Sequence, residues 1–440
     1  MIERGFNLKR IFLHISVKKT VNAIWDKIDY GSLFDRLHQE NIIDCPNLGN
    51  QVWLQGLVSE VTCENVTYAF LEKDTTVEEI NNNYDVVIFP TANIFYKDHI
   101  KLLEELAERF SKIRIPIYVI SCGAQADSYD DLDNLCSSIR EPATKFIRAV
   151  YNSGGEFALR GYFTKEFFDK LGFKSAEVTG CPSLYQMGRN IHIDKPDVSP
   201  NNLKPVINGH FNFLNMDFYR RIFSEYPSAI YMDQDYFGRK LYDSDFDGFD
   251  NVDFKWFLGQ IRHGKYQELQ LLAQDRVRLF SDMANWREYL IREKYNFSFG
   301  GRIHGNILSI LSGIPAVVYG CDSRTREMAE FYDIPTVTPE QLKSKKSLYD
   351  IYSELDYTKF NDSFGEKYDG FQDFFIRHDI LPKLNDKNIF FTKEYDNDGK
   401  CPPIINQAKI DNMGHRMQQH KNIYRLLNEC VDIACKIKNK

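Results

Sequence analysis

The apolar residues in the first half of the chain fall into two kinds of segment. Tyr84–Pro90 and Ile115–Ser121 are short apolar runs rich in β-branched residues, which predicts strands. Between them, His99–Lys112 carries apolar residues at helical spacing along one face. Because the strands are apolar on both faces, this order predicts a parallel sheet covered by helices. The scheme repeats in a strand, a helix and a strand at Phe157–Arg160, Thr164–Leu171 and Ala176–Thr179.

A polar segment interrupts this pattern, and a second series of strands and helices follows it. Asn190–Leu203 is rich in Asp, Pro, Ser and Asn, which is typical of a linker between lobes. After it, four apolar runs predict strands at Pro205–Asn208, Ala229–Met232, Asn296–Phe299 and Pro315–Tyr319. Helical patterns separate these strands at about 213–226, 266–293 and 305–312.

The two series predict an α/β protein of two Rossmann-like lobes with a ligand-binding cleft between them. We expect the first lobe over residues 1–195 and the second over residues 204–350. Residues 351–440 form a C-terminal extension that begins with an irregular, charged and aromatic pattern and ends in a helix at about 405–437. We expect this extension to be mostly helical and to pack across both lobes.

Composition narrows the class of protein. The chain has 440 residues, of which 43% are hydrophobic, and this is enough for two lobes that each bury a core. Its formal net charge of −7, without a dense Lys/Arg block, argues against a nucleic-acid partner. The nine cysteines are scattered and contain no CxxC pair, which favours a reducing cytoplasm over a disulfide framework.

No segment predicts export or a membrane span. The N-terminus is basic but has no apolar stretch of signal-peptide length. The longest uncharged run, Ile303–Cys321, contains glycines and a proline that fit a helix, a turn and a strand better than a membrane helix. We therefore expect a cytoplasmic protein with at most peripheral contact at the inner face of the membrane.

The segment that follows the third strand of the second lobe carries the strongest chemical signal. There, Gly301 and Gly305 flank Arg302 and His304 at the start of a helix. Glycines allow a tight turn and close approach of a ligand, and the free N–H groups of a helix start attract an anion. Arg302 matches a carboxylate or phosphate, and His304 can transfer a proton beside it. The structural alternative is that Arg302 pairs with a carboxylate and His304 caps the helix.

Weaker signals lie in the first lobe, at a glycine turn and at strand ends. The turn at 47–51 precedes a helical pattern, and residues 122–125 follow a predicted strand. Open α/β sheets bind ligands at the carboxyl ends of strands, so these positions are candidate binding sites. An arginine at such a position is more often a salt-bridge partner than a ligand. The candidates are Asn47, Gly49, Asn50, Gly123, Gln125 and Arg160.

Four segments in this order resemble the polysaccharide pyruvyl transferase family, over about residues 45–340. They are Asn47-Leu-Gly-Asn50, Arg160-Gly-Tyr-Phe-Thr-Lys-Glu-Phe, Arg302-Ile-His-Gly continuing to Gly313-Ile-Pro, and Asp322-Ser-Arg-Thr-Arg-Glu-Met-Ala-Glu-Phe. The Arg-x-His-Gly block is the most specific of the four. The first motif departs from the family pattern, which usually ends Asn-x-Gly-Asp where this chain has Asn50.

The resemblance implies a GT-B-like fold and a transferase. Members of the family move the enolpyruvyl unit of phosphoenolpyruvate onto two sugar hydroxyls and form a pyruvate ketal. The acceptor would be a sugar of a surface-polysaccharide or glycan precursor, free or carried on a lipid. The resemblance assigns donor binding to Arg160 and Arg302 and general acid–base catalysis to His304. Phosphoenolpyruvate is a substrate, so no cofactor is implied.

The sequence does not predict a metal site, because HExxH, DxD-plus-His and Cys/His clusters are absent. The acidic runs Asp233-Gln-Asp235 and Asp243-Ser-Asp245-Phe-Asp247 carry carboxylates of the kind that bind Mg²⁺. We interpret both runs as solvated acidic loops.

Two other functions stay open. In the first, the protein is a GT-B glycosyltransferase, and Arg302 and His304 bind the diphosphate of a nucleotide sugar. In the second, it is a glycan-binding relative without catalytic activity, for which Asn50 is the main support. The sequence predicts neither the acceptor sugar nor the oligomeric state.

Overall fold

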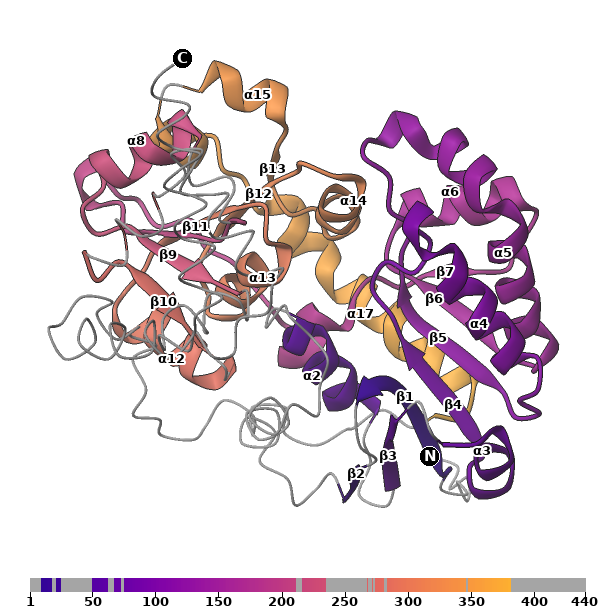
Figure 1. The fold of residues 1–440 in the computed structure, drawn as a ribbon. Coiled ribbons are helices and arrows are strands. Elements are labelled where there is room, and N and C mark those ends of the chain that lie inside the picture. The colour runs from indigo at the N-terminus through magenta and orange to yellow at the C-terminus, as the bar shows by residue number, and fades with distance from the viewer. Residues whose placement is uncertain are drawn as a thin grey trace, which may run out of the picture.

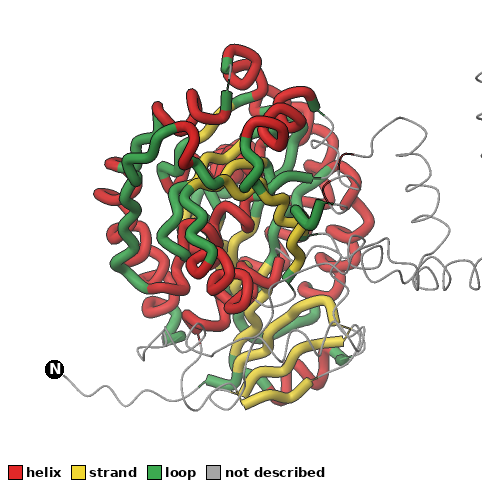
Figure 2. The backbone as a smooth tube through the Cα atoms, turned by 90° about the vertical axis from the view of Figure 1, so that its left-hand side faces the viewer, coloured by secondary structure: helices red, strands yellow, loops and turns green. Residues whose placement is uncertain are grey.

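The computed structural model describes residues 9–17, 21–24, 50–61, 67–72, 75–210, 216–234, 267, 271, 274–280, 283–345 and 347–380. These residues form two β-sheets with helices around them, in two lobes (Figure 1). Helices and loops lie outside the strands on most sides of the molecule (Figure 2). The predicted two-lobed α/β fold is confirmed. The boundaries at 195 and 204 stay a prediction, and the helix expected at 405–437 lies outside the described residues.

The described residues of the N-terminal lobe form a sheet of seven strands. They are β1 (Ile11–Val17), β2 (Val21–Ile24), β3 (Thr67–Glu72), β4 (Val86–Pro90), β5 (Ile117–Cys122), β6 (Glu156–Leu159) and β7 (Glu177–Val178). Their order across the sheet is β2-β3-β1-β4-β5-β6-β7, and β2 alone runs antiparallel to its neighbour. The strand order reverses at β1, so β1 and β4 flank a switch point where such sheets bind ligands.

The central strands of this sheet are apolar throughout because both of their faces are covered. Val87 and Val119 pack on one face with α4 (Ile100–Phe110), α5 (Leu132–Asn152) and α6 (Tyr162–Leu171). Ile88 and Ile120 point to the opposite face, where α2 (Asn50–Val61) packs. Successive residues of a strand alternate between faces, so a strand covered on both sides needs a continuous apolar run. The short helix α3 (Val77–Asn83) precedes β4.

The described strands of the C-terminal lobe form a parallel sheet. Its strands are β8 (Pro205–Ile207), β9 (Ile230–Asp233), β10 (Val277–Leu279), β11 (Phe297–Gly300), β12 (Ala316–Tyr319) and β13 (Thr336–Val337). Their order is β10-β9-β8-β11-β12-β13. If β8 is numbered as the first strand of this lobe, the order across the sheet is 3-2-1-4-5-6. This is the strand order of dinucleotide-binding Rossmann domains. The switch point lies between β8 and β11.

Helices and short 3₁₀ turns connect these strands. The described helices from β8 onward are α8 (Asp217–Glu225), α12 (Met283–Arg292), α13 (Ile303–Leu311), α14 (Ser323–Tyr332), α15 (Pro339–Ser344), α16 (Leu348–Ser353) and α17 (Thr358–Arg377). The described 3₁₀ turns are η2 (Lys97–His99), η3 (Tyr129–Asp131), η4 (Pro182–Met187) and η5 (Pro200–Asn202).

The helical pattern predicted at 266–293 is wrong in its middle, because β10 lies there and pairs with β9. A strand of three residues is too short to display a period of two. Its apolar residues therefore merge with those of the following α12, and the two segments together resemble one long helix.

Helix α17 contacts both lobes, and Figure 1 shows it running from one to the other. Beside its first residues, the hydroxyl of Tyr357 donates to the carbonyl of Ala316 in β12, at 2.7 Å. Near its last turn, the ring centroid of Phe374 is 6.2 Å from that of Tyr118 in β5. The helix therefore joins the two sheets through buried contacts.

Candidate functional site

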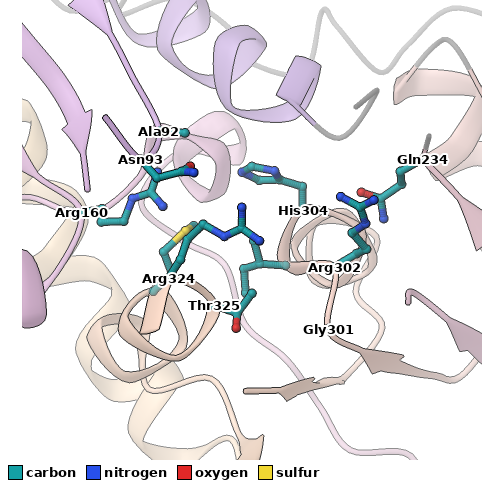
Figure 3. Close-up of a pocket in the computed structure, with 11 residues that line it drawn as sticks. Ala92, Asn93, Arg160, Gln234, Gly301, Arg302, His304, Arg324 and Thr325 are labelled. Atoms are coloured by element: carbon teal, nitrogen blue, oxygen red, sulfur yellow. The ribbon is translucent and has the colours of Figure 1, made fainter. Parts of the chain in front are cut away.

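A pocket lies where the two lobes face each other, and Figure 3 shows it from close by. Its lining comes from the segments that follow β4, β6, β9 and β11, and from the start of α14. These are carboxyl ends of strands close to the switch points of both sheets, where open α/β sheets place ligands. The lining residues are Ala92, Asn93, Arg160, Gln234, Gly301, Arg302, Ile303, His304, Arg324, Thr325 and Met328.

Two glycines allow the sharp turn from β11 into α13. Gly300 has a φ of 151°, and a Cβ atom there would lie 1.9 Å from the carbonyl oxygen of Asn208. The same carbonyl accepts a hydrogen bond from the amide of Arg302, at 2.9 Å. A side chain at 300 would therefore push β8 away from the turn. Gly301 lies in the pocket lining itself.

A chain of buried side chains fixes the start of α13. Asn208 donates to the hydroxyl of Ser298 at 2.7 Å, and Ser298 donates to Asn306 at 2.8 Å. Asn306 in turn donates to the carbonyl of Gly300, at 2.7 Å. All three side chains are buried, so this network sets the position of the helix start and of the residues it presents to the pocket.

His304 is the second residue of α13 and is 9% exposed. Burial and the nearby charges of Arg160, Arg324 and Arg302 lower its pKa to about 3, so the imidazole is neutral at pH 7. Arg302, not His304, occupies the N-cap position, and no side chain caps the helix there. The alternative in which His304 caps the helix is therefore wrong.

Arg160 lies at the end of β6 and is almost completely buried. Its Nε and Nη2 atoms each lie 3.4 Å from the carbonyl oxygen of Ser121, to which they donate. A Cβ atom on Gly123 would lie 2.6 Å from Arg160 Nε. Burial lowers the pKa of Arg160, because the interior solvates its charge less well than water does. Gly123 itself is not in the lining; it provides space for Arg160.

Arg324 is a third arginine in the pocket that the sequence analysis did not assign to the site. It is the second residue of α14, and its Nη2 donates to Asp322 at 3.1 Å. Its Nε is buried and has no hydrogen-bond partner among the described residues. The signal was present in the Asp322-Ser-Arg motif, but the motif alone does not show that α14 points its N-terminus into the pocket.

Asn93 and Gln234 are further lining residues that the sequence did not reveal. Asn93 donates to Gln125 at 2.5 Å, so the predicted Gln125 supports the lining from behind. Gln234 is 2% exposed and follows the last residue of β9. A Cβ atom on Gly305 would lie 2.4 Å from Gln234 Nε2 and 2.2 Å from Asn208 Oδ1. Because Gly305 has no side chain, Asn208 and Gln234 can pack against it. Gly305 itself does not line the pocket.

The structure thus brings four of the predicted residues together in one pocket: Arg160, Gly301, Arg302 and His304. In Figure 3 the imidazole lies between Arg160 on one side and Arg302 on the other. Asn47 and Gly49 lie outside the described residues. Asn50 is the first residue of α2, and its side chain lies outside the described part of the chain.

The interpretation of Asp233 as part of a solvated loop is wrong. Asp233 is the last residue of β9 and is 1% exposed, and it accepts hydrogen bonds from the hydroxyl of Tyr231 and the amide of Gln234. The run 243–247 lies outside the described residues. Among the residues that are described, no three His, Cys, Asp or Glu side chains form a group that could hold a metal ion.

The chemistry of the pocket suits an anion with more than one charge. Three guanidinium groups offer planar forks for carboxylate or phosphate oxygens. The start of α13 adds amides without partners in the helix. A neutral imidazole in the same space can accept a proton, or donate one after an anion has offset the arginine charges.

The fold and this pocket define a two-lobed α/β protein with a cationic site between its lobes. The sequence model of the polysaccharide pyruvyl transferases matches residues 7–323. The chain belongs to the polysaccharide pyruvyl transferase family and is therefore a transferase. None of the helices in the described part of the chain is long and apolar enough to cross a membrane.

Similar solved structures share little sequence with this chain. A Listeria monocytogenes protein assigned as a UDP-N-acetylglucosamine 2-epimerase has 10% identity and a TM-score of 0.43, over 90% of this chain and 100% of that one. The S. aureus protein MnaA with UDP has 12% identity and a TM-score of 0.40, over 86% and 100%. The glycosyltransferase SnogD from Streptomyces nogalater has 8% identity and a TM-score of 0.29, over 83% and 95%. No curated protein matches the chain.

Proposed function

We propose that this protein transfers the enolpyruvyl unit of phosphoenolpyruvate to two hydroxyl groups of a sugar and forms a pyruvate ketal. The acceptor is a sugar of a surface-polysaccharide or glycan precursor, free or carried on a lipid. The convergence of Arg160, Arg302, Arg324 and His304 on one pocket carries the proposal, because these four groups match the charges and the proton transfers of that reaction.

The donor has a carboxylate and a phosphate attached to the same carbon atom. Its negative charges require several cationic donors in a small space, and the three arginines supply them from both lobes. Arg160 comes from the N-terminal lobe, whereas Arg302 and Arg324 come from the C-terminal lobe. The donor would therefore bridge the lobes, with one anionic group toward the amides at the start of α13.

The reaction needs one histidine in two protonation states. A proton goes to the methylene carbon of phosphoenolpyruvate, and a sugar hydroxyl adds to the cation-like C2. Phosphate then leaves with the C2–O electron pair, and a second hydroxyl closes the ketal while both hydroxyl protons are released. His304 would deliver the first proton and accept one later, because it is the imidazole in the same pocket as the three arginines.

The charge of the donor sets the state of His304. In the free pocket, burial and the charges of the three arginines lower the pKa of His304 to about 3. A bound trianion offsets these charges and stabilises the imidazolium, which raises the pKa toward neutrality. Acid catalysis is then available only when the donor is present.

The test is a mass-spectrometric screen of glycan acceptors with phosphoenolpyruvate, together with thermal unfolding in the presence of candidate donors. We expect phosphoenolpyruvate to raise the melting temperature and to give a product with the added mass of a ketal. Protection by a UDP- or GDP-sugar instead, with transfer of a sugar, would identify a glycosyltransferase. Binding of a glycan without turnover of any donor would identify a glycan-binding protein.

A further inference from the structure

Glu327 is a buried carboxyl group beside the pocket that the proposed reaction does not use. It lies on α14, three residues after Arg324, and is 1% exposed. Its Oε1 accepts a hydrogen bond from the amide of Thr164, at 2.6 Å. Thr164 is in the first turn of α6, so a carboxyl group of the C-terminal lobe occupies the N-terminus of a helix in the N-terminal lobe.

This contact places the carboxyl group close enough to Arg160 for the two charges to interact. A Cβ atom on Gly161, the residue that follows Arg160, would lie 2.3 Å from Cγ and 3.0 Å from Cδ of Glu327. Only a residue without a side chain lets Glu327 approach this closely. The charge of Arg160 lowers the pKa of Glu327, while burial, which is the larger effect, raises it to about 7.

The two oxygens of Glu327 differ. Oε1 is held by Thr164, whereas Oε2 is buried and has no hydrogen-bond partner among the described residues. A proton can therefore sit on Oε2 while Oε1 keeps its hydrogen bond. A buried carboxyl oxygen without a partner is costly when charged, so the group needs the positive charge of Arg160 close by.

We propose that Glu327 is a positioning residue whose negative charge balances that of Arg160 while the pocket is empty. When an anionic donor binds beside Arg160 and offsets its charge, Glu327 takes up one proton from solvent at Oε2. The inference rests on the proposed function, because it assumes that the anion is phosphoenolpyruvate. The step forms one O–H bond on Oε2 and breaks none within the protein. Binding of the donor is therefore coupled to uptake of a proton.

The other groups that face Glu327 do not account for such an uptake. Cys122 in β5 and Tyr129 in η3 have pKa values raised by burial, so both stay protonated at pH 8. Glu330, on the next turn of α14, is exposed, and its charge raises the pKa of Glu327. Arg160 carries its charge throughout. In the pocket, the pKa of His304 is about 3 before the donor binds.

The experiment is calorimetric titration of the full chain with phosphoenolpyruvate at pH 8, in buffers that differ in ionisation enthalpy. We expect the wild-type protein to take up as much as one proton per donor bound. Above pH 7 its Kd should rise by up to about tenfold per pH unit, as linkage requires. Glu327→Gln keeps an acceptor for Thr164 but cannot titrate, so most of the uptake at pH 8 and most of the slope of Kd with pH should disappear. The small remainder belongs to His304, whose pKa the donor raises only toward neutrality.

Two matched variants separate the carboxyl group from its surroundings. Glu330→Gln removes one negative charge from the same helix and should keep the uptake. His304→Gln should also keep it at pH 8, because Glu327 remains. No uptake by the wild-type protein, or the same uptake and slope in Glu327→Gln, overturns the inference. The wild-type measurement stands even if Glu327→Gln does not fold.

A second measurement needs no donor and so distinguishes failure of this inference from failure of the proposed function. The folded-state pKa of Glu327 lies above its ordinary value of 4.5, so its contribution to stability is present below pH 4.5 and is lost as the pH rises through about 7. Glu327→Gln should gain stability relative to wild type from pH 5 to pH 8. No gain overturns the role of Glu327. Absence of phosphoenolpyruvate binding, with this gain present, overturns the proposed donor.

Discussion

Gly123 leaves the space that the side chain of Arg160 occupies. A Cβ atom on Gly123 would lie 2.6 Å from Nε and 2.8 Å from Cδ of the arginine, and 2.6 Å from the carbonyl oxygen of Ala92. Gly123→Ala should therefore displace Arg160 from the pocket and lower the affinity for phosphoenolpyruvate. Overpacking of this kind also costs about 1–3 kcal/mol of stability. Calorimetric titration and urea unfolding would measure the two effects.

The matched control for that substitution is Gly370→Ala in α17. A Cβ atom there meets nothing within 4 Å, and the position is helical. We expect a gain of about 0.5–1 kcal/mol in stability and unchanged donor affinity. Equal donor affinity in Gly123→Ala and Gly370→Ala would show that Arg160 does not bind the donor.

His304→Gln should lose catalysis but keep the donor. General acid–base groups contribute on the order of 10²- to 10⁴-fold in rate, and the three arginines remain in the variant. The measurement is single-turnover ketal formation at saturating phosphoenolpyruvate. Near-normal turnover would remove His304 from the mechanism.

Substitution of the arginines should weaken binding of the donor. Arg160→Lys keeps the charge but loses the planar fork, and a lost hydrogen bond between charged groups costs about 1.5–3 kcal/mol, or roughly 10- to 100-fold in affinity. Arg302→Ala should lose more, because the charge is lost as well. The affinity of each variant is measured by titration with phosphoenolpyruvate. If Arg160→Lys binds it as tightly as the wild type, the role of Arg160 is structural.

The buried His304 should make the protein less stable in acid. Its pKa is about 3 in the folded chain, against about 6.5 for an imidazole in water. Between these values the unfolded chain binds the proton and the folded chain does not, so the free energy of unfolding falls as the pH falls from 6.5 toward 3. The slope approaches about 1.4 kcal/mol per pH unit.

His304→Gln removes this titration. Relative to wild type, its free energy of unfolding should therefore increase between pH 7.5 and pH 5, because only the wild type has to exclude a proton from a buried site. Urea unfolding of both proteins at the two pH values gives the difference. A constant difference would mean that His304 is not held neutral in the folded chain.

Much of the fold could be predicted from periodicity, because buried parallel strands such as Val86–Pro90 are continuous apolar runs. The strand Val277–Leu279 was missed, because three residues are too few to show this signal. The bounds of α17 were not predicted within the extension expected to be mostly helical, because Gly365 and Gly370 lower the helical propensity of an already aromatic segment. Helix α17 forms because its buried phenylalanines pack against both lobes.

The chemistry of the site was predictable where a motif joins a strand to a helix, as at Arg302 and His304. Residues that enter the pocket through tertiary packing were not. Gln234 follows a strand that the sequence does place, yet nothing local shows that its amide would lie against Gly305. Arg324 depends on the direction of α14, which its contacts with the N-terminal lobe fix.

Helix α17 also determines how the two halves of the chain can be separated. Phe371 lies 4.6 Å from Tyr185, centroid to centroid, and Arg377 forms an ion pair with Glu177, so the end of this helix belongs to the core of the N-terminal lobe. Proteolytic cleavage in the connecting segment at 190–203 should leave both fragments associated through α17. On heating, the nicked protein should still melt in a single transition, because neither lobe can release the helix without exposing its aromatic face to water.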